Sequence, residues 1–214
     1  MIQPQIQEQK NLQTKIRVQS RAPRQTTSEP LDFDEFKGLL GKLRENGEYK
    51  WELYCLVSFC TAFRVSDVKT TTWEDIFNKN DFVKIEQKTQ KMRKIPIGHS
   101  FQKRLRELYS LMGCPDMNST VLLNERTGGP YSTQYINRTL KKWIGPYRLS
   151  IKKFSTHSFR KTFGRYVWEM MGKTMEALML LCLIFKHDNP QTTMIYIGIR
   201  QDEINGVFKM IELD

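Results

Sequence analysis

The side chains best suited to chemistry lie within residues 156–198 of this 214-residue chain. His157 and Arg160 are three positions apart, His187 follows later, and Tyr196 comes nine positions after it. An imidazole can move a proton near neutral pH, and a guanidinium holds an oxyanion without losing its charge. These residue types predict a site for an anionic substrate.

A helix is expected to position the first two of these groups. It begins at Ser155 or Thr156, since both are good N-caps. At about 100° per residue, one helix face carries cations and the other carries apolar side chains. The cationic face comprises His157, Arg160, Lys161 and Gly164, and the apolar face Phe159, Phe163, Tyr166 and Met170. We expect the apolar face to pack and the cationic face to present an anion site.

The charge of the chain favours a polyanionic partner. The formal net charge is +11, and nucleic acid is the first polyanion to consider. On charge alone, a basic protein whose lysines are merely solvated remains an alternative.

Cysteine and histidine usage indicates the compartment. The four cysteines form no C-x-x-C pair and the three histidines lack metal-ligand spacing, so we expect reduced thiols and no metal. The longest apolar run, 177–185, is shorter than the roughly 20 residues that cross a bilayer. The sequence therefore predicts a soluble cytoplasmic protein, nucleoid-associated, with no membrane contact.

The middle of the chain contains the only convincing β region. We expect three short antiparallel strands at 73–76, 82–87 and 93–97, joined by turns. The second hairpin carries a cluster of cations at or near its tip: Lys88, Lys91, Arg93 and Lys94. Such a tip is either a solvated edge guarded against aggregation or a finger that lies along a phosphate backbone.

The dispersed polar residues, taken in order, resemble the catalytic domain of the tyrosine recombinases, the phage integrase family. Singly, His157 would be a helix cap or core histidine and Tyr196 a packing tyrosine. The ordered set is specific: an arginine after a helix, a lysine in a β-turn, H-x-x-R on a helix, then H-x8-Y, spread over 31–204.

The resemblance assigns family positions residue by residue. The matching residues are Arg64 in AFRVSD for the first arginine, Asp67 for the acidic residue after it, Lys88 in QKTQKMRKIPI for the hairpin lysine, His157 and Arg160 in HSFR, His187 for the His or Trp position, and Tyr196 in TTMIY for the nucleophile.

The resemblance implies nucleophilic attack on a DNA phosphodiester by Tyr196. A free phenol, with a pKa of about 10, needs a base, and His157 is expected to be the general base or proton shuttle. The product is a 3′-phosphotyrosyl link. Because this link keeps the bond energy, neither ATP nor a metal nor any other cofactor is expected.

The remaining residues would stabilise charge. Arg64 and Arg160 are expected to bind the nonbridging phosphate oxygens. Lys88 would protonate the leaving 5′-hydroxyl and His187 would donate a hydrogen bond to a phosphate oxygen. Asp67 would orient Arg64 or a histidine.

The sequence also departs from the family pattern. Lys186 stands where the family usually has glycine, and Gly198 where a histidine often follows the tyrosine by two positions. The helical N-terminal domain that clamps DNA in most relatives is expected to be absent.

The function implied is a site-specific recombinase or integrase catalytic domain; integration, excision and resolution all remain open. The alternatives are relaxation of DNA as by a type IB topoisomerase, or an inactive DNA-binding module of the same fold. The partners expected are double-stranded DNA and further copies of the chain, in a dimer or tetramer formed through the segment after Tyr196. Candidate DNA contacts are Lys91, Arg93, Lys94, Arg138 and Lys161.

The fold expected is α+β and mainly helical, a tyrosine-recombinase-like bundle with a small three-stranded antiparallel sheet at one edge. Residues 1–28 are expected to be a flexible basic tail and 29–214 the catalytic domain. Helices are expected at 31–47, 49–62, 100–112, 132–144, 155–170, 174–185, 190–197 and 202–211, with helix starts marked by Asp32, Ser100, Ser132, Thr174 and Asn189. The helix at 174–185 is apolar almost all round, so we expect it to be central to the core.

Overall fold

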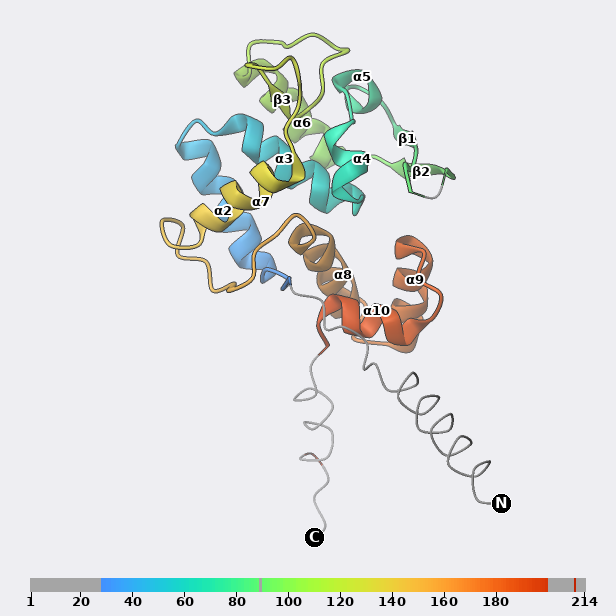
Figure 1. The fold of residues 1–214 in the computed structure, drawn as a ribbon. Helices are drawn as coiled ribbons and strands as arrows, with labels where there is room; N and C mark the ends of the chain where they lie inside the picture. Colours follow the sequence, from blue (N-terminus) through green and yellow to red (C-terminus); the bar gives the residue numbers. More distant parts are fainter. Residues whose placement is uncertain (1–27, 89, 200–209, 211–214) are drawn as a thin grey trace, which may run out of the picture.

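The computed structural model describes residues 28–88, 90–199 and 210. These residues are mainly helical, as predicted, and also form two small antiparallel ladders where one three-stranded sheet was expected (Figure 1). The helices are α2 (Phe33–Glu45), α3 (Tyr49–Thr61), α4 (Val65–Lys69), α5 (Trp73–Ile76), α6 (His99–Leu111), α7 (Thr133–Trp143), α8 (Ser158–Met170), α9 (Met175–Phe185) and α10 (Pro190–Ile197). The strands are β1 (Asp81–Ile85), β2 (Met92–Pro96), β3 (Leu123–Asn124) and β4 (Gly129–Pro130). The predicted tail, except Ser28, and most of the predicted 202–211 helix lie outside the described residues.

Side-chain caps fix the starts of several helices. Asp32, Ser132, Thr174 and Asn189 each accept a backbone N–H from the first turn of α2, α7, α9 and α10, as the sequence predicts. The predicted cap of α6 is wrong, because Gly98 rather than Ser100 holds the N-cap position. The helix start predicted at Ser155 or Thr156 is also wrong, because α8 begins at Ser158 and His157 is its N-cap residue.

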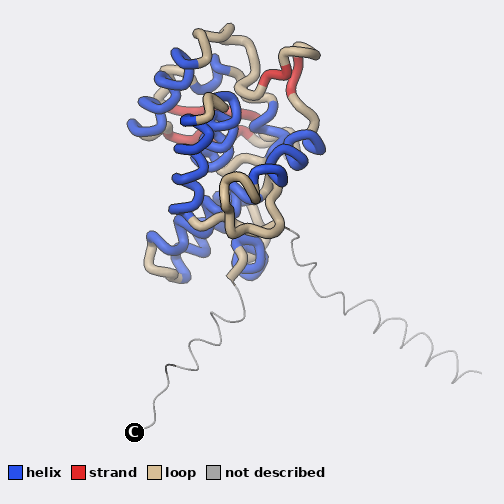
Figure 2. The backbone as a smooth tube through the Cα atoms, turned by 90° about the vertical axis from the view of Figure 1, so that its left-hand side faces the viewer, coloured by secondary structure: helices blue, strands red, loops and turns tan. Residues whose placement is uncertain are grey.

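The expected first strand of the sheet is a helix instead. Residues Trp73–Ile76 form α5, which is held by a capping box between Thr72 and Asp75. This local pairing competes with strand formation in a segment too short to show a clear alternation. The sheet therefore has two strands, β1 and β2, in a register that pairs Ile85 with Met92 (Figures 1 and 2).

The core has two parts. Residues of α2, α3, α6 and α7 build the larger cluster, together with β1 and the loop before α8. Helices α8, α9 and α10 build the smaller cluster and lie together at one end of the molecule (Figure 1). The expectation that α9 is central to the core is wrong, because it buries one face and exposes Met175, Met179, Leu180 and Leu183.

Gly164 lets the helices of the smaller cluster approach closely. A Cβ atom at Gly164 would lie 2.6 Å from Cγ2 of Ile197 and 2.8 Å from Cζ of Phe185. The predicted cationic face of α8 is therefore not open to solvent, since Arg160, Lys161 and Gly164 on it are all buried. It packs against α9 and α10.

None of the helices in the described part of the chain has both the length and the apolar character needed to cross a membrane.

Candidate active site

Arg160 occupies the junction of three helices. It is 4% exposed, its Nη1 donates to the carbonyl of Ala62, and its Nη2 donates to the carbonyl of Phe185 at 2.9 Å. These carbonyls end α3 and α9, where unpaired C=O groups and the helix dipole favour a cation. Burial lowers the pKa of Arg160 to about 10, so the group stays charged at neutral pH. Two of its five N–H donors are used, which leaves three.

Arg64 lies at the N-cap of α4, directly after the turn at Ala62, whose φ of 49° is in the left-handed region. Its side chain is 21% exposed, and Nη1 donates to Oε2 of Glu86 at 3.3 Å. At four predicted site residues burial is the main cause of the pKa shift, and the charge of Arg64 lowers the pKa of each. These residues are His157, Arg160, His187 and Tyr196. The charge of Arg64 thus reaches all four of these residues.

His187 follows the end of α9. Lys186 before it has a φ of 54°, which explains why the family pattern has glycine at that position. The Nδ1 atom of His187 lies 2.9 Å from Oγ1 of Thr193, a buried residue of α10 that the sequence analysis missed. Burial, then the charges of Arg160 and Arg64, lower the pKa of His187 to about 4, so the ring is neutral at pH 7.

Tyr196 lies in the last turn of α10, and its ring packs against the rings of Phe185 and His187. Its ring centroid is 5.3 Å from that of Phe185 and 5.1 Å from that of His187, which it meets edge-on at 76°. The hydroxyl is buried and has no partner in hydrogen-bond geometry among the described residues. Burial raises the pKa of the phenol, and the nearby charges of Arg160 and Arg64 oppose that rise. The phenol is protonated at neutral pH and needs a base.

His157 is the N-cap residue of α8 and is exposed at the surface. Atoms packed around its imidazole lower its pKa below 6.5, and the charges of Arg160, Lys161 and Arg64 lower it further. In the contacts of the described residues, the ring of His187 rather than that of His157 touches Tyr196.

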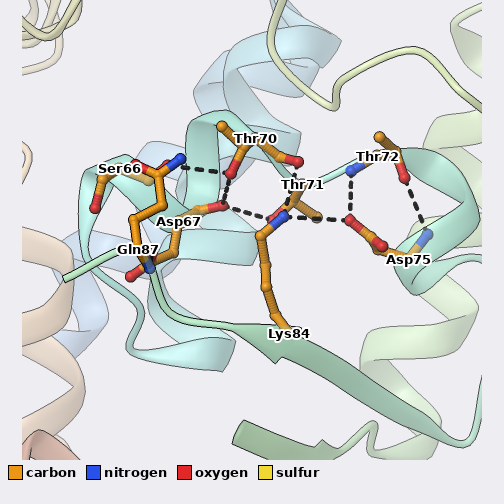
Figure 3. A network of polar contacts seen from close by, with 8 residues as sticks. All are labelled: Ser66, Asp67, Thr70, Thr71, Thr72, Asp75, Lys84 and Gln87. Atoms are coloured by element: carbon orange, nitrogen blue, oxygen red, sulfur yellow. Dashed lines mark hydrogen bonds and ion pairs between the residues drawn. The ribbon is translucent and has the colours of Figure 1, made fainter. Parts of the chain in front are cut away.

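The hairpin that carries Lys88 is anchored to α4. Asp67 is fully buried, and its Oδ1 accepts the backbone N–H of Gln87 at 2.9 Å, next to Lys88 (Figure 3). On the same side, Nζ of Lys84 donates to the carbonyl of Thr70 at 2.7 Å. Asp67 therefore anchors the hairpin. The role expected from the sequence was a different one, to orient Arg64 or a histidine. Lys88 itself is exposed in the turn and, within the described part of the chain, makes no contact with Arg64 or Arg160.

Two of the five candidate DNA contacts are enclosed by protein. Lys161 is 2% exposed, and its Nζ donates to the carbonyl of Ser28 and lies 5.3 Å from the ring centroid of Tyr196. Burial lowers its pKa to about 8. The side chain of Arg93 is 12% exposed and lies over the ring of Phe63. In this structure the side chains of Lys161 and Arg93 are packed within the protein, and neither presents a free face to solvent.

The other three candidates are exposed: Lys91, Lys94 and Arg138. Arg138 lines an open groove of about 530 Å³ on α7, together with Gln134, Asn137, Lys141 and Lys142. The groove is tied to the active-site loop, since Oδ1 of Asn137 accepts the N–H of Thr156 at 2.9 Å. This hydrogen bond joins α7 to the loop that ends at His157.

Glu86 is a further functional candidate that the sequence did not reveal. It is 1% exposed and contacts Arg64, Arg93 and Lys186. A glutamate within a polar hairpin resembles any solvated residue, and only the folded chain shows its burial.

Comparisons with known proteins agree with this arrangement. The model of the phage integrase family matches residues 29–203. The probable integrase/recombinase YoeC of Bacillus subtilis is 30% identical over 150 residues, which cover 70% of this chain and 78% of that protein. The tyrosine recombinase XerD of Corynebacterium glutamicum is 28% identical over 153 residues, which cover 70% of this chain but 48% of XerD.

A solved structure shares the fold. The XerH site-specific recombinase bound to a palindromic difH substrate, in a post-cleavage complex, matches with a TM-score of 0.67 at 15% identity. The match covers 89% of this chain and 55% of that one. The comparisons favour a site-specific recombinase over a topoisomerase. The chain belongs to the phage integrase family and has the fold of a tyrosine recombinase catalytic domain.

Proposed function

We propose that this domain cleaves and rejoins double-stranded DNA at a specific site through a 3′-phosphotyrosyl intermediate. The observation that carries the proposal is the buried hydroxyl of Tyr196, which lies against His187 and within the field of Arg160 and Arg64. A phenol that only packed would have no need of two guanidinium groups close enough for their charges to lower its pKa. We place the reaction in the cytoplasm, at the nucleoid, because DNA is the substrate.

The chemistry is a transesterification. The oxygen of Tyr196 attacks the scissile phosphorus, the P–O5′ bond breaks, and the 5′-oxygen leaves. His157 takes the phenolic proton and Lys88 supplies a proton to the leaving oxygen. Rejoining is the reverse step, in which a 5′-hydroxyl attacks the phosphotyrosyl bond. His187, neutral and adjacent to the phenol, hydrogen bonds a phosphate oxygen.

Charge stabilisation comes from the two arginines. Negative charge grows on the nonbridging oxygens during attack, and preorganised donors in a partly dry site stabilise it. Arg160 keeps three N–H donors beyond those bound to Ala62 and Phe185. Since backbone carbonyls hold its guanidinium, little reorganisation is needed when the phosphate binds.

Duplex DNA would lie across the exposed cations of the hairpin and α7. Lys91 lies in the hairpin turn and Lys94 in the middle of β2, and Arg138, Lys141 and Lys142 line the α7 groove. Phosphate contacts of this kind position a protein on DNA without reading its sequence.

Self-association would use the C-terminal segment of a second copy. Helix α9 exposes an apolar face made of Met175, Met179, Leu180 and Leu183. The sequence after Tyr196 supplies a matching apolar stripe at Ile204, Val207, Phe208 and Ile211. The palindromic substrate of XerH fits this proposal, because a two-fold DNA site pairs with a two-fold protein assembly.

A suicide substrate tests the function. A duplex nicked close to the crossover point loses a short fragment after cleavage, which traps the covalent complex. We expect a protein–DNA adduct without added metal or ATP. Relaxation of a plasmid that lacks a recombination site would instead support a topoisomerase. DNA binding without any adduct would support an inactive module.

A further inference from the structure

Glu86 is a buried carboxylate surrounded by cations from three parts of the chain. Its Oε2 lies 3.3 Å from Nη1 of Arg64 and 3.0 Å from Nζ of Lys186, and its Oε1 lies 3.5 Å from Nη1 of Arg93. These cations come from the start of α4, the end of α9 and strand β2. Glu86 follows β1 directly, two positions before Lys88.

The carboxylate offsets repulsion among the cations of the site. Arg64, Arg93, Arg160 and Lys186 would otherwise share one partly dry region, where like charges repel strongly. The pKa of Arg160 reflects this balance: burial lowers it most, Arg64 and Arg93 lower it further, and Glu86 raises it. Glu86 is the anion that keeps this cluster assembled before DNA arrives.

The geometry indicates that Glu86 orients Arg64 and does not block its access to a phosphate. Glu86 is 1% exposed, while the side chains of Arg64 and Lys186 are 21% and 28% exposed. The carboxylate is therefore more deeply buried than Arg64, while the Nζ atom of Lys186 is buried together with it. Glu86 contacts Arg64 at Nη1, and a guanidinium carries five N–H donors in all, so one carboxylate contact does not exhaust its capacity to bind a phosphate.

Lys186 extends this arrangement to the nucleophile. Its left-handed backbone ends α9 one residue before His187, and its side chain reaches across to the hairpin. The pair with Glu86 therefore joins the α9–α10 unit, which carries Tyr196, to the hairpin that carries Lys88.

We propose that Glu86 is a positioning residue that fixes Arg64 for the scissile phosphate and, through Lys186, sets the α9–α10 unit against the hairpin. The proposal rests on the proposed function and goes beyond it, since it assigns a role to a residue that never touches DNA.

The test uses the full chain with Glu86→Gln, which keeps the shape and removes the charge. The matched control is Glu52→Gln, because Glu52 is likewise fully buried and pairs with two arginines, Arg44 and Arg104. At saturating suicide substrate, Glu86→Gln should slow adduct formation about ten- to hundred-fold, as misplacement of a reacting group does. The rate per folded molecule should be unchanged in the control. An unchanged or faster rate in Glu86→Gln would overturn the proposal.

A binding experiment separates this proposal from the catalytic one. In a Tyr196→Phe background, affinities are measured for duplexes with a normal phosphate or a neutral methylphosphonate at the cleavage position. The unmodified Glu86 protein should prefer the charged duplex, and Glu86→Gln should reduce that preference several-fold. The reduction should vanish in an Arg64→Ala background. If the preference survives Glu86→Gln intact, Glu86 does not act through Arg64, whether or not the chain cleaves DNA.

Discussion

The ring of His187 meets the ring of Tyr196 edge-on, with centroids 5.1 Å apart and planes at 76°. His187 is fixed from its other side by Thr193, which belongs to the same helix as the tyrosine. A neutral imidazole can pack in this way beside two arginines, whereas an imidazolium would add a third positive charge. The packing therefore depends on the protonation state of His187.

The first prediction concerns stability at low pH. The pKa of His187 is about 4 in the folded chain and about 6.5 when unfolded. Both states are neutral above pH 6.5, and only the unfolded state is protonated between 6.5 and 4. Stability is therefore lost as the pH falls through that window, and the loss levels off below pH 4. After discounting for partial exposure, we expect a loss of about 1 kcal/mol relative to His187→Gln.

Urea unfolding at pH 7 and pH 4.5 measures this loss. The matched control is His99→Gln, since His99 is exposed at the start of α6. A stability difference between the parent and His187→Gln that stays constant with pH would contradict the prediction.

The second prediction concerns Gly164. An added methyl would lie 2.6 Å from Ile197 and 2.8 Å from Phe185, so Gly164→Ala overpacks the α8–α10 contact. We expect a loss of about 1–3 kcal/mol of unfolding free energy and a drop in adduct formation per folded molecule, because α10 carries Tyr196.

Gly38→Ala is the control for this substitution. Gly38 lies exposed in α2 and a Cβ there meets nothing within 4 Å, so alanine should stabilise the chain by up to about 1 kcal/mol. Equal effects of the two substitutions would show that α8 and α10 do not pack as described.

The third prediction concerns Asp67 and Lys88. Asp67→Ala removes the acceptor of the Gln87 N–H and frees the hairpin, so cleavage should slow about tenfold or more. Asp67→Asn can still accept that hydrogen bond and should lose less cleavage activity.

A substrate with sulfur at the bridging 5′ position tests the link to Lys88. Its thiolate leaving group departs without protonation, because a thiol is far more acidic than an alcohol. This substrate should restore the rate of Asp67→Ala, and failure of the rescue would separate Asp67 from Lys88.

The fourth prediction concerns salt. The logarithm of the DNA association constant should fall linearly with the logarithm of salt concentration, with a slope of about −0.9 per neutralised phosphate. Replacing Lys91, Lys94 or Arg138 by glutamine should each make the slope shallower by about 0.9. Lys37 lies at an exposed position of α2 beside Asp34, and Lys37→Gln should leave the slope unchanged. Salt-independent binding would contradict an electrostatic DNA surface.

Local patterns were enough to predict most of the secondary structure. The caps at Asp32, Ser132, Thr174 and Asn189 depend on neighbouring residues and were predicted correctly. The strand expected at 73–76 was wrong, because the Thr72–Asp75 capping box outweighed a short apolar pattern.

The ordered polar motif selected residues far apart in the sequence, and the structure places Arg160, His187 and Tyr196 near one another while Lys88 lies in the exposed hairpin turn. The motif carried no information on burial. Helical periodicity could not tell that α8 packs its cationic face against α10, since that depends on the missing Cβ of Gly164. Periodicity also placed Lys161 on the solvent-facing side of this helix, whereas the structure encloses its side chain. Glu86 pairs with Arg64 and Lys186, which lie far from it in the sequence, so no local pattern records these contacts. Thr193 contacts His187 across the turn between α9 and α10, and hydrophobic periodicity does not predict such a side-chain pair.

The most direct test of the central claim is mass mapping of the adduct trapped on a nicked suicide substrate. We predict one modified peptide, with a 3′-phosphoryl group on the oxygen of Tyr196, and no adduct with Tyr196→Phe although that variant still binds the duplex. An adduct on another residue, or one that persists in Tyr196→Phe, would contradict the account.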